Sequence, residues 1–127
     1  MRIATRFSVW MLSLLMVYAG VVAAAGKSAV FPPQLRSFWE TSRPCDSSES
    51  SDRDSRFRIT ERQRLNYEES EDLTSAKLLT DSPLTWRIVT TSDVGPANLH
   101  QPRIYVLQGD LLAISDGQSA RMYMRCR

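Results

Sequence analysis

The clearest alternation of apolar and polar residues lies near the end of the chain. Residues 103–107 and 111–114 form two mostly apolar runs that flank a Gly-Asp turn signal at 109–110. Glycine tolerates the positive φ of a tight hairpin turn. After a second turn signal at 116–117, apolar residues stand at every second position from Met122. This pattern predicts a three-stranded antiparallel meander.

Residues 56–65 also alternate with period two, which is typical of a strand with one apolar face. Phe57 and Leu65 belong to that face. Glu61 and Gln63 interrupt it, so we expect a bulge, an edge or a turn near them.

The middle of the chain predicts further short strands. They are expected at residues 76–79 and 85–91, on either side of the turn signal at 81–83. The acidic residues between 68 and 72 indicate a bend, and the Gly- and Pro-containing residues 92–102 indicate a loop.

A helical turn is expected before the first long strand. Pro33 suits the first position of a helix, and Leu35, Phe38 and Trp39 recur at helical spacing. A short strand that contains Phe38 and Trp39 is the alternative.

Together these patterns predict a mainly β protein. Its fold class is a small antiparallel meander barrel or sandwich of about six or seven strands, with a short N-terminal helical turn. The spacing of the turns suits both architectures, so closure of the sheet is left open.

The first 25 residues have the composition of a secretory signal peptide. Two arginines open the segment, no charge follows up to residue 22, and the alanines at 23–25 suit a signal peptidase. Cleavage would send a protein without stable membrane insertion to the periplasm or out of the cell. An uncleaved anchor is the alternative, because residues 7–25 approach the roughly 20 apolar residues of a spanning helix.

Behind this segment the sequence predicts a flexible leader at residues 26–30 and a single β domain at 31–127. Within the domain, residues 46–55 consist of Asp, Ser, Glu and one Arg, so we expect a disordered loop there. Cys45 and Cys126 are the only cysteines, and an oxidising compartment predicts a disulfide between them. Closing a loop of about 80 residues would stabilise the fold by about 4 kcal/mol.

The charge distribution argues against one class of partner. Of the 16 Lys and Arg residues, Arg2 and Arg6 lie in the signal segment, whereas all 14 Asp and Glu residues follow it. The mature chain is therefore formally neutral and lacks the strongly basic character of a nucleic-acid-binding domain. Its basic residues other than Lys27 and Lys77 are arginines, which suit carboxylate and phosphate recognition.

The sequence contains no recognisable catalytic set. His100 is the only histidine, and neither a nucleophile elbow nor a nucleotide-binding glycine motif is present. With both cysteines in a disulfide, no ligand set for a metal ion remains. We therefore expect a non-enzymatic protein without a cofactor or metal.

The polar face of the alternating strand is the first candidate site. It would offer an anion-binding or partner-binding surface made of four arginines, Arg56, Arg58, Arg62 and Arg64. Other strands could add neighbours, namely Arg87, Arg103, Arg121 and Arg125. The alternative is an ordinary outer face whose arginines pair with acidic residues across the strands.

A cavity inside a closed sheet is the second candidate site. Its lining would come from apolar residues of the later strands, Trp86, Ile104, Val106 and Met122. The first predicted function is a binding protein of the inhibitor or immunity kind, which occupies another envelope protein through a sheet face or the 92–102 loop. The alternatives are a small-ligand carrier with an internal cavity and a structural or assembly factor of the envelope.

Short motifs spread over most of the mature chain add a resemblance. Trp39 is followed by Cys45, a Tyr-Glu pair stands at 67–68, and the last predicted strand ends in Arg125-Cys126. This set resembles a loose group of small exported, periplasmic bacterial β proteins. The resemblance implies an envelope location and a lipocalin-like or related β fold, and it transfers no catalytic residue.

Overall fold

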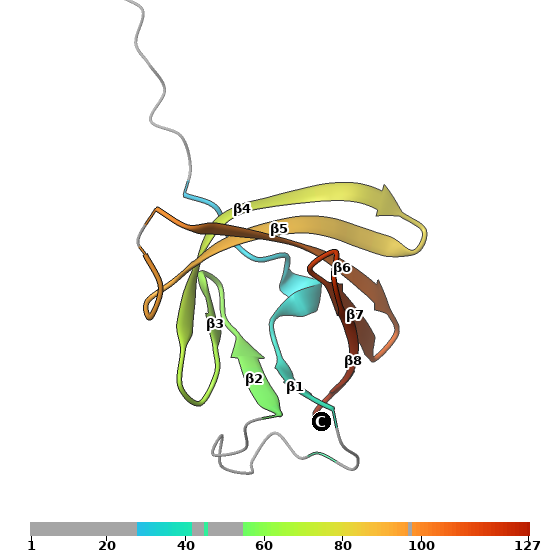
Figure 1. The fold of residues 1–127 in the computed structure, drawn as a ribbon. Coiled ribbons are helices and arrows are strands. Elements are labelled where there is room, and N and C mark those ends of the chain that lie inside the picture. The colour runs from blue at the N-terminus through green and yellow to red at the C-terminus, as the bar shows by residue number, and fades with distance from the viewer. Residues whose placement is uncertain (1–27, 42–44, 46–54, 97) are drawn as a thin grey trace, which may run out of the picture.

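The computed structural model describes residues 28–41, 45, 55–96 and 98–127. In this part of the chain, eight antiparallel strands follow one another around a ring, and β1 pairs with β8, so the sheet closes into a barrel (Figure 1). A 3-10 turn, η1 (Pro33–Leu35), precedes the strands. The strands are β1 (Phe38–Glu40), β2 (Arg56–Ile59), β3 (Gln63–Leu65), β4 (Ser70–Asp81), β5 (Leu84–Ser92), β6 (His100–Gln108), β7 (Leu111–Ser115) and β8 (Ala120–Arg125).

The mainly β, antiparallel prediction is confirmed, and the described strands number eight rather than six or seven. The run at 56–65 is a hairpin, because the chain turns after Ile59. In that turn the Thr60 amide donates to Gln63 O over 2.8 Å, and the Gln63 amide donates to Thr60 Oγ1 over 3.1 Å. The helical turn and the short strand that were alternatives near Phe38 are both present, as η1 and β1.

The acidic bend is shorter than the sequence predicts. The Asn66 amide donates to Glu69 O over 2.8 Å and closes the turn between β3 and β4. Glu71 and Asp72 already belong to β4, whose 12 residues form a long hairpin with β5. A strand therefore begins where the charges indicated a bend, and it carries Glu71 into the barrel with no exposed surface. The predicted 92–102 loop is likewise shorter, since β6 begins within it.

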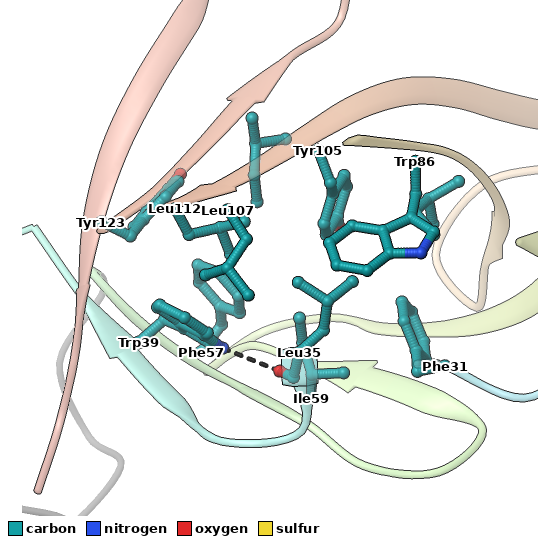
Figure 2. Close-up of a cluster of buried hydrophobic side chains, with 12 residues drawn as sticks. Phe31, Leu35, Trp39, Phe57, Ile59, Trp86, Tyr105, Leu107, Leu112 and Tyr123 are labelled. Atoms are coloured by element: carbon teal, nitrogen blue, oxygen red, sulfur yellow. Dashed lines mark hydrogen bonds between the residues drawn. The ribbon is translucent and has the colours of Figure 1, made fainter. Parts of the chain in front are cut away.

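The N-terminal segment fills one end of the barrel. Phe31 and Leu35 are fully buried and join a core cluster with inward side chains of the strands (Figure 2). The Trp39 Nε1 donates to Leu35 O over 2.9 Å, and the Phe31 amide donates to Glu61 O over 2.8 Å. These bonds fix η1 beside the turn between β2 and β3, where the burial of large apolar side chains supplies most of the stabilisation.

The two ends of the barrel differ in chemistry. We call the end near η1 the closed end, and the opposite end, where β1, β3, β5 and β7 finish, the open end. Trp86, Leu107 and Leu112 belong to the core cluster and lie toward the closed end. Toward the open end the inward positions of β3 and β4 become polar. An eight-stranded barrel leaves an interior just wide enough to be filled by side chains or to hold one small ligand.

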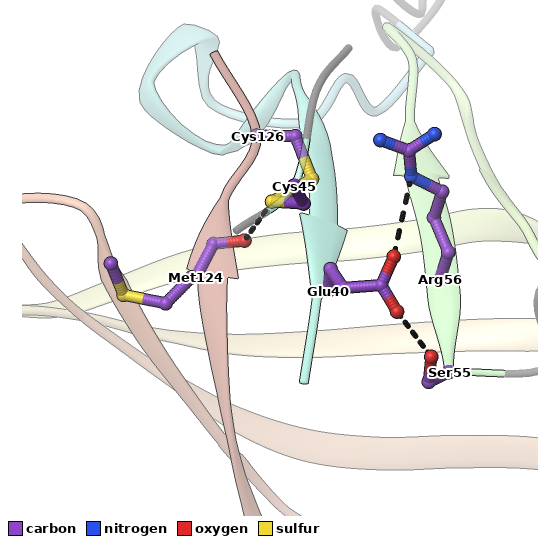
Figure 3. The surroundings of a disulfide bond; sticks show 6 residues. All are labelled: Glu40, Cys45, Ser55, Arg56, Met124 and Cys126. Carbon is purple, nitrogen blue, oxygen red and sulfur yellow. Dashed lines mark hydrogen bonds and ion pairs between the residues drawn. A yellow bond between two sulfur atoms is a disulfide. The ribbon is translucent and has the colours of Figure 1, made fainter. Parts of the chain in front are cut away.

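A disulfide joins Cys45 to Cys126, as the sequence predicts (Figure 3). Their Cα atoms are 4.9 Å apart. Cys126 directly follows β8, and its amide donates to Phe38 O over 2.9 Å, so the bond lies at the seam where β1 and β8 close the barrel. Beside it, the buried side chains of Glu40 and Arg56 form an ion pair at 3.7 Å (Figure 3).

Two predicted segments lie wholly or largely outside the described residues. These are the signal peptide at 1–25 and, apart from Ser55, the Ser/Asp loop at 46–55. Among the residues that the structure does describe, no helix is long and apolar enough to cross a membrane. The disulfide is compatible with an exported protein.

Candidate functional site

The four arginines expected on one strand face do not share a surface. Arg56 is buried, Arg58 is exposed on the outer face, and Arg62 is exposed in the turn between β2 and β3. Arg64 is 9% exposed and lies opposite Ile59 in the register, inside the barrel. The turn after Ile59 interrupts the period-two alternation of the side chains. The prediction of a common arginine face is therefore wrong, and of these four arginines only Arg64 points into the barrel.

The residues expected to line a cavity separate in the same way. Trp86 faces the core, whereas Ile104, Val106 and Met122 lie on the outer side of the barrel, Met122 with 55% of its surface exposed. Alternation separates the two rows of a strand, but it does not say which row faces inward when both contain apolar residues. The inward rows of β6 and β8 carry Arg103, Tyr105, Leu107, Arg121 and Tyr123.

Four neighbouring strands assemble a buried ion-pair cluster toward the open end. Glu71 on β4 accepts a 2.6 Å hydrogen bond from Arg64 Nη1 on β3 and a 2.5 Å hydrogen bond from Arg103 Nη1 on β6. Thr90 Oγ1 on β5 donates to the same carboxylate over 2.9 Å. Both carboxylate oxygens are therefore engaged, and Glu71 balances the charge of one of the two arginines.

This cluster keeps its charges at neutral pH. Burial alone would raise the pKa of Glu71, but the charges and hydrogen bonds of Arg64 and Arg103 outweigh burial and hold the pKa below its ordinary value of 4.5. Burial would lower the pKa of Arg103, yet Glu71 raises it above its ordinary value. Two positive charges and one negative charge are thus fixed inside the barrel.

Aromatic rings hold Arg64 in place. Its guanidinium carbon lies 4.3 Å from the centre of the Phe57 ring, and Phe57 packs edge to face against Tyr123 with ring centres 4.7 Å apart. A guanidinium stacked on a ring keeps its edge available for hydrogen bonds. Arg64 Nη1 bonds to Glu71, whereas Arg64 Nε is buried and has no partner in the described part of the chain.

Two shallow hollows adjoin at Arg64. The first has a volume of about 180 Å³ and the second about 170 Å³, and both are lined by Arg64, Arg121 and Tyr123. We call these two hollows together the arginine mouth. The first is also lined by Arg103, Ile114, Asp116 and Ser119, and the second by Thr41, Ser55, Arg56, Phe57 and Asn66.

Donor groups near the arginine mouth lack partners among the described residues. The guanidinium of Arg121 makes no hydrogen bond or ion pair with any of them. The hydroxyl of the fully buried Tyr105 has no hydrogen-bond partner among them either. Burial raises the pKa of Tyr105, against the opposing effect of Arg64 and Arg103, so the hydroxyl stays protonated. Buried polar groups without partners are rare and mark places for water or a ligand.

A second carboxylate lies at the edge of the arginine mouth and is already satisfied. Asp116 Oδ1 accepts hydrogen bonds from the amides of Ser119 at 2.8 Å and Gln118 at 2.9 Å, and these bonds lower its pKa. Among the described residues, three arginines line the first hollow, and two carboxylates oppose them: Asp116 in the lining and Glu71, which pairs with Arg64 and Arg103, so that a positive excess remains. Such a lining attracts anions.

The structure brings together part of what the sequence named. Arg103 and Arg121 were expected as neighbours of the arginine strand, and both line the same hollow as Arg64. Arg87 is exposed on the outer side of β5, and Arg125 pairs with Asp110 at 3.2 Å near the closed end. Sequence reasoning missed Glu71 and Tyr105. The period-two relation between Glu71 and Leu73 is the signal that would have placed Glu71 on a strand.

Metal-ligating side chains are dispersed over the described part of the chain. Within the described ranges, no three His, Cys, Asp or Glu side chains gather as a metal site would require. His100 is exposed at the start of β6. No protein-family model, no curated protein and no solved structure matches the chain. The lipocalin-like relationship therefore stays a prediction.

Proposed function

We propose that this protein is an exported, non-enzymatic binding protein that holds a small organic anion in its arginine mouth. The observation that carries the proposal is the convergence of Arg64, Arg103 and Arg121 from three strands on one hollow. Only part of their hydrogen-bonding capacity is used by Glu71. This is the small-ligand alternative of the sequence analysis, with the site moved to the open end.

Guanidinium groups favour carboxylates for geometric reasons. A planar guanidinium offers parallel N–H donors that match the two oxygens of a carboxylate. Arg64 is oriented by its contacts with Phe57 and Glu71, so little side-chain freedom is lost when a ligand binds. Arg121 adds a cation that has no protein partner in the described residues.

The size of the hollows restricts the ligand. Each is smaller than the roughly 300–1,000 Å³ of pockets that enclose drug-sized ligands. The closed end is filled by Phe31, Leu35 and the rest of the core cluster, which argues against a large apolar ligand there. The arginine mouth therefore suits a small acid or the acidic end of a longer molecule.

Titration with acetate tests this function. We expect saturable binding by nuclear magnetic resonance, and we expect Arg121→Gln to raise the Kd about tenfold, since hydrogen bonds to charged groups contribute about 1.5–3 kcal/mol. Arg62→Gln is the matched control, because Arg62 is an exposed arginine in the turn between β2 and β3. Equal losses in both variants would reduce the effect to net charge and contradict the proposal.

A partner-occupying role is the second candidate function. It is favoured by apolar side chains on the outer side of the later strands, where Ile104 is 36%, Leu111 is 38% and Met122 is 55% exposed. Native mass spectrometry of an envelope extract should then detect a complex that Met122→Glu abolishes. Recovery of the free monomer alone would count against this role.

A further inference from the structure

The second hollow of the arginine mouth offers an acceptor as well as donors. Asn66, in the turn between β3 and β4, lines this hollow, and its buried Oδ1 has no donor among the described residues. Arg64 lines the same hollow, is 9% exposed and has an Nε without an acceptor in the described part of the chain. Two residues that line this hollow therefore carry a buried donor and a buried acceptor that have no partner among the described residues.

A simple carboxylate would satisfy one of these two needs. An ionised carboxylate accepts hydrogen bonds and donates none, so it matches Arg64 and Arg121 but leaves Asn66 Oδ1 without a donor. The missing group on the ligand is a hydroxyl or an amine placed near the carboxylate.

The charge of the side chains around the second hollow distinguishes a ligand hydroxyl from a ligand amine. Among the described residues, the second hollow is lined by Arg56, Arg64 and Arg121 and by no acidic side chain, although Glu40 forms an ion pair with Arg56. An ammonium group would be repelled by Arg64 and Arg121, whereas a neutral hydroxyl would not be. The surroundings therefore favour the hydroxyl.

We infer that the ligand is a small hydroxy acid, whose carboxylate lies between Arg64 and Arg121 and whose hydroxyl donates to Asn66 Oδ1. This inference rests on the proposed function and names the ligand class of the same site. The volume of about 170 Å³ limits the ligand to an acid of a few carbon atoms or to the end of a longer hydroxy acid.

Glycolate and acetate form the matched pair that tests the inference, because they differ by one hydroxyl. In nuclear magnetic resonance titrations of the purified, disulfide-bonded protein, we expect glycolate to bind about fivefold more tightly, the effect of one neutral hydrogen bond. Glycine, which carries an ammonium in place of the hydroxyl, should bind more weakly than glycolate.

Substitution of Asn66 locates the effect. Asn66→Ala should remove the preference for glycolate over acetate. Asn98→Ala, at an exposed asparagine in the connection before β6, should keep the preference.

The outcomes separate the inference from the function on which it rests. If acetate and glycolate bind equally to the unsubstituted protein, the hydroxy-acid inference is overturned while anion binding stands. If the preference persists in Asn66→Ala, or if glycine binds as tightly as glycolate, the assignment of the hydroxyl to Asn66 is overturned. If no acid binds, the inference and the proposed function both fail.

Discussion

Glu71 determines how the inward arginines are accommodated inside the barrel. It has no exposed surface and accepts hydrogen bonds from Arg64, Arg103 and Thr90. Removing one member of a buried ion pair leaves an uncompensated charge, which costs more than the net contribution of the pair itself.

Replacement of this carboxylate should therefore be strongly destabilising. We expect Glu71→Gln to lower the free energy of unfolding by about 3 kcal/mol, because the buried Arg64 keeps its charge without a counterion. Denaturant unfolding measures this loss. Glu61→Gln, at an exposed glutamate in the turn between β2 and β3, is the control and should change stability by less than about 0.5 kcal/mol. A comparable small loss in both variants would mean that the ion-pair cluster does not stabilise the fold.

The lowered pKa of Glu71 makes the stability that the ion-pair cluster contributes depend on pH. Its pKa in the folded protein is below the ordinary value of 4.5, so the ionised form contributes stability above about pH 4.5. This contribution is lost as the pH falls toward the folded-state pKa. Asp110 and Asp116 also have lowered pKa values and act in the same direction, so the contribution of Glu71 is the difference between the unsubstituted protein and Glu71→Gln. That difference should shrink on acidification below pH 4.5, and a difference independent of pH would contradict the assignment.

At the residue scale, the sequence predicts which side chains suit a binding site better than it predicts whether those side chains face into the barrel or outward. It named Arg64, Arg103 and Arg121 as candidates, because arginine is suited to anions whatever its position. It placed Met122 inside and Tyr123 outside, since an apolar row was expected to face the core. Near the open end of a barrel the inward row contains polar side chains, so the rule that apolar residues lie inside fails there.

At the element scale, the seam between β1 and β8 is one of the two shortest ladders in the described wall. These strands share two paired positions, Trp39 with Arg125 and Glu40 with Met124, and unlike β2 and β3 they are not joined by a tight turn. The disulfide from Cys45 to Cys126 lies directly beside this seam and adds the covalent link that the short ladder lacks.

Reduction of the disulfide should therefore open the seam first. We expect loss of the bond to cost about 4 kcal/mol through the entropy of the unfolded chain. In hydrogen exchange with reductant, the amides of β1 and β8 should lose more protection than those of β5, which lies in the long hairpin. Cys45→Ser/Cys126→Ser, exposed to the same reductant, controls for effects of the reagent. Loss of protection that is uniform over all strands would contradict a seam-first opening.

The elements that the sequence predicted best are those held by local signals. The meander from β6 to β8 follows from alternation and from Gly109, whose φ of 60° suits the first central position of its two-residue turn. The strand β1 has three residues, and its pairing with β2 and β8 depends on partners far away in the sequence. Such pairings leave no periodic trace, which is why barrel closure could not be predicted.

At the scale of the whole molecule, the fold separates two tasks along the barrel. The closed end is filled by η1 and the core cluster and supplies stability. The open end carries Arg64, Arg103 and Arg121 around shallow hollows and is the part to which we assign the proposed ligand. The sequence predicted the mainly β class and the disulfide, but a polar interior at one end arises from closure and could not be read from any single strand.

The proposed binding of an organic anion at the open end can be tested by mapping amide chemical shifts during a titration with glycolate. We predict saturable shifts concentrated at Arg64, Asn66, Ser119 and Arg121, with the closed-end amides of Glu61 and Gly109 unchanged. Shifts that fail to saturate, or that concentrate at the closed end, would contradict the claim.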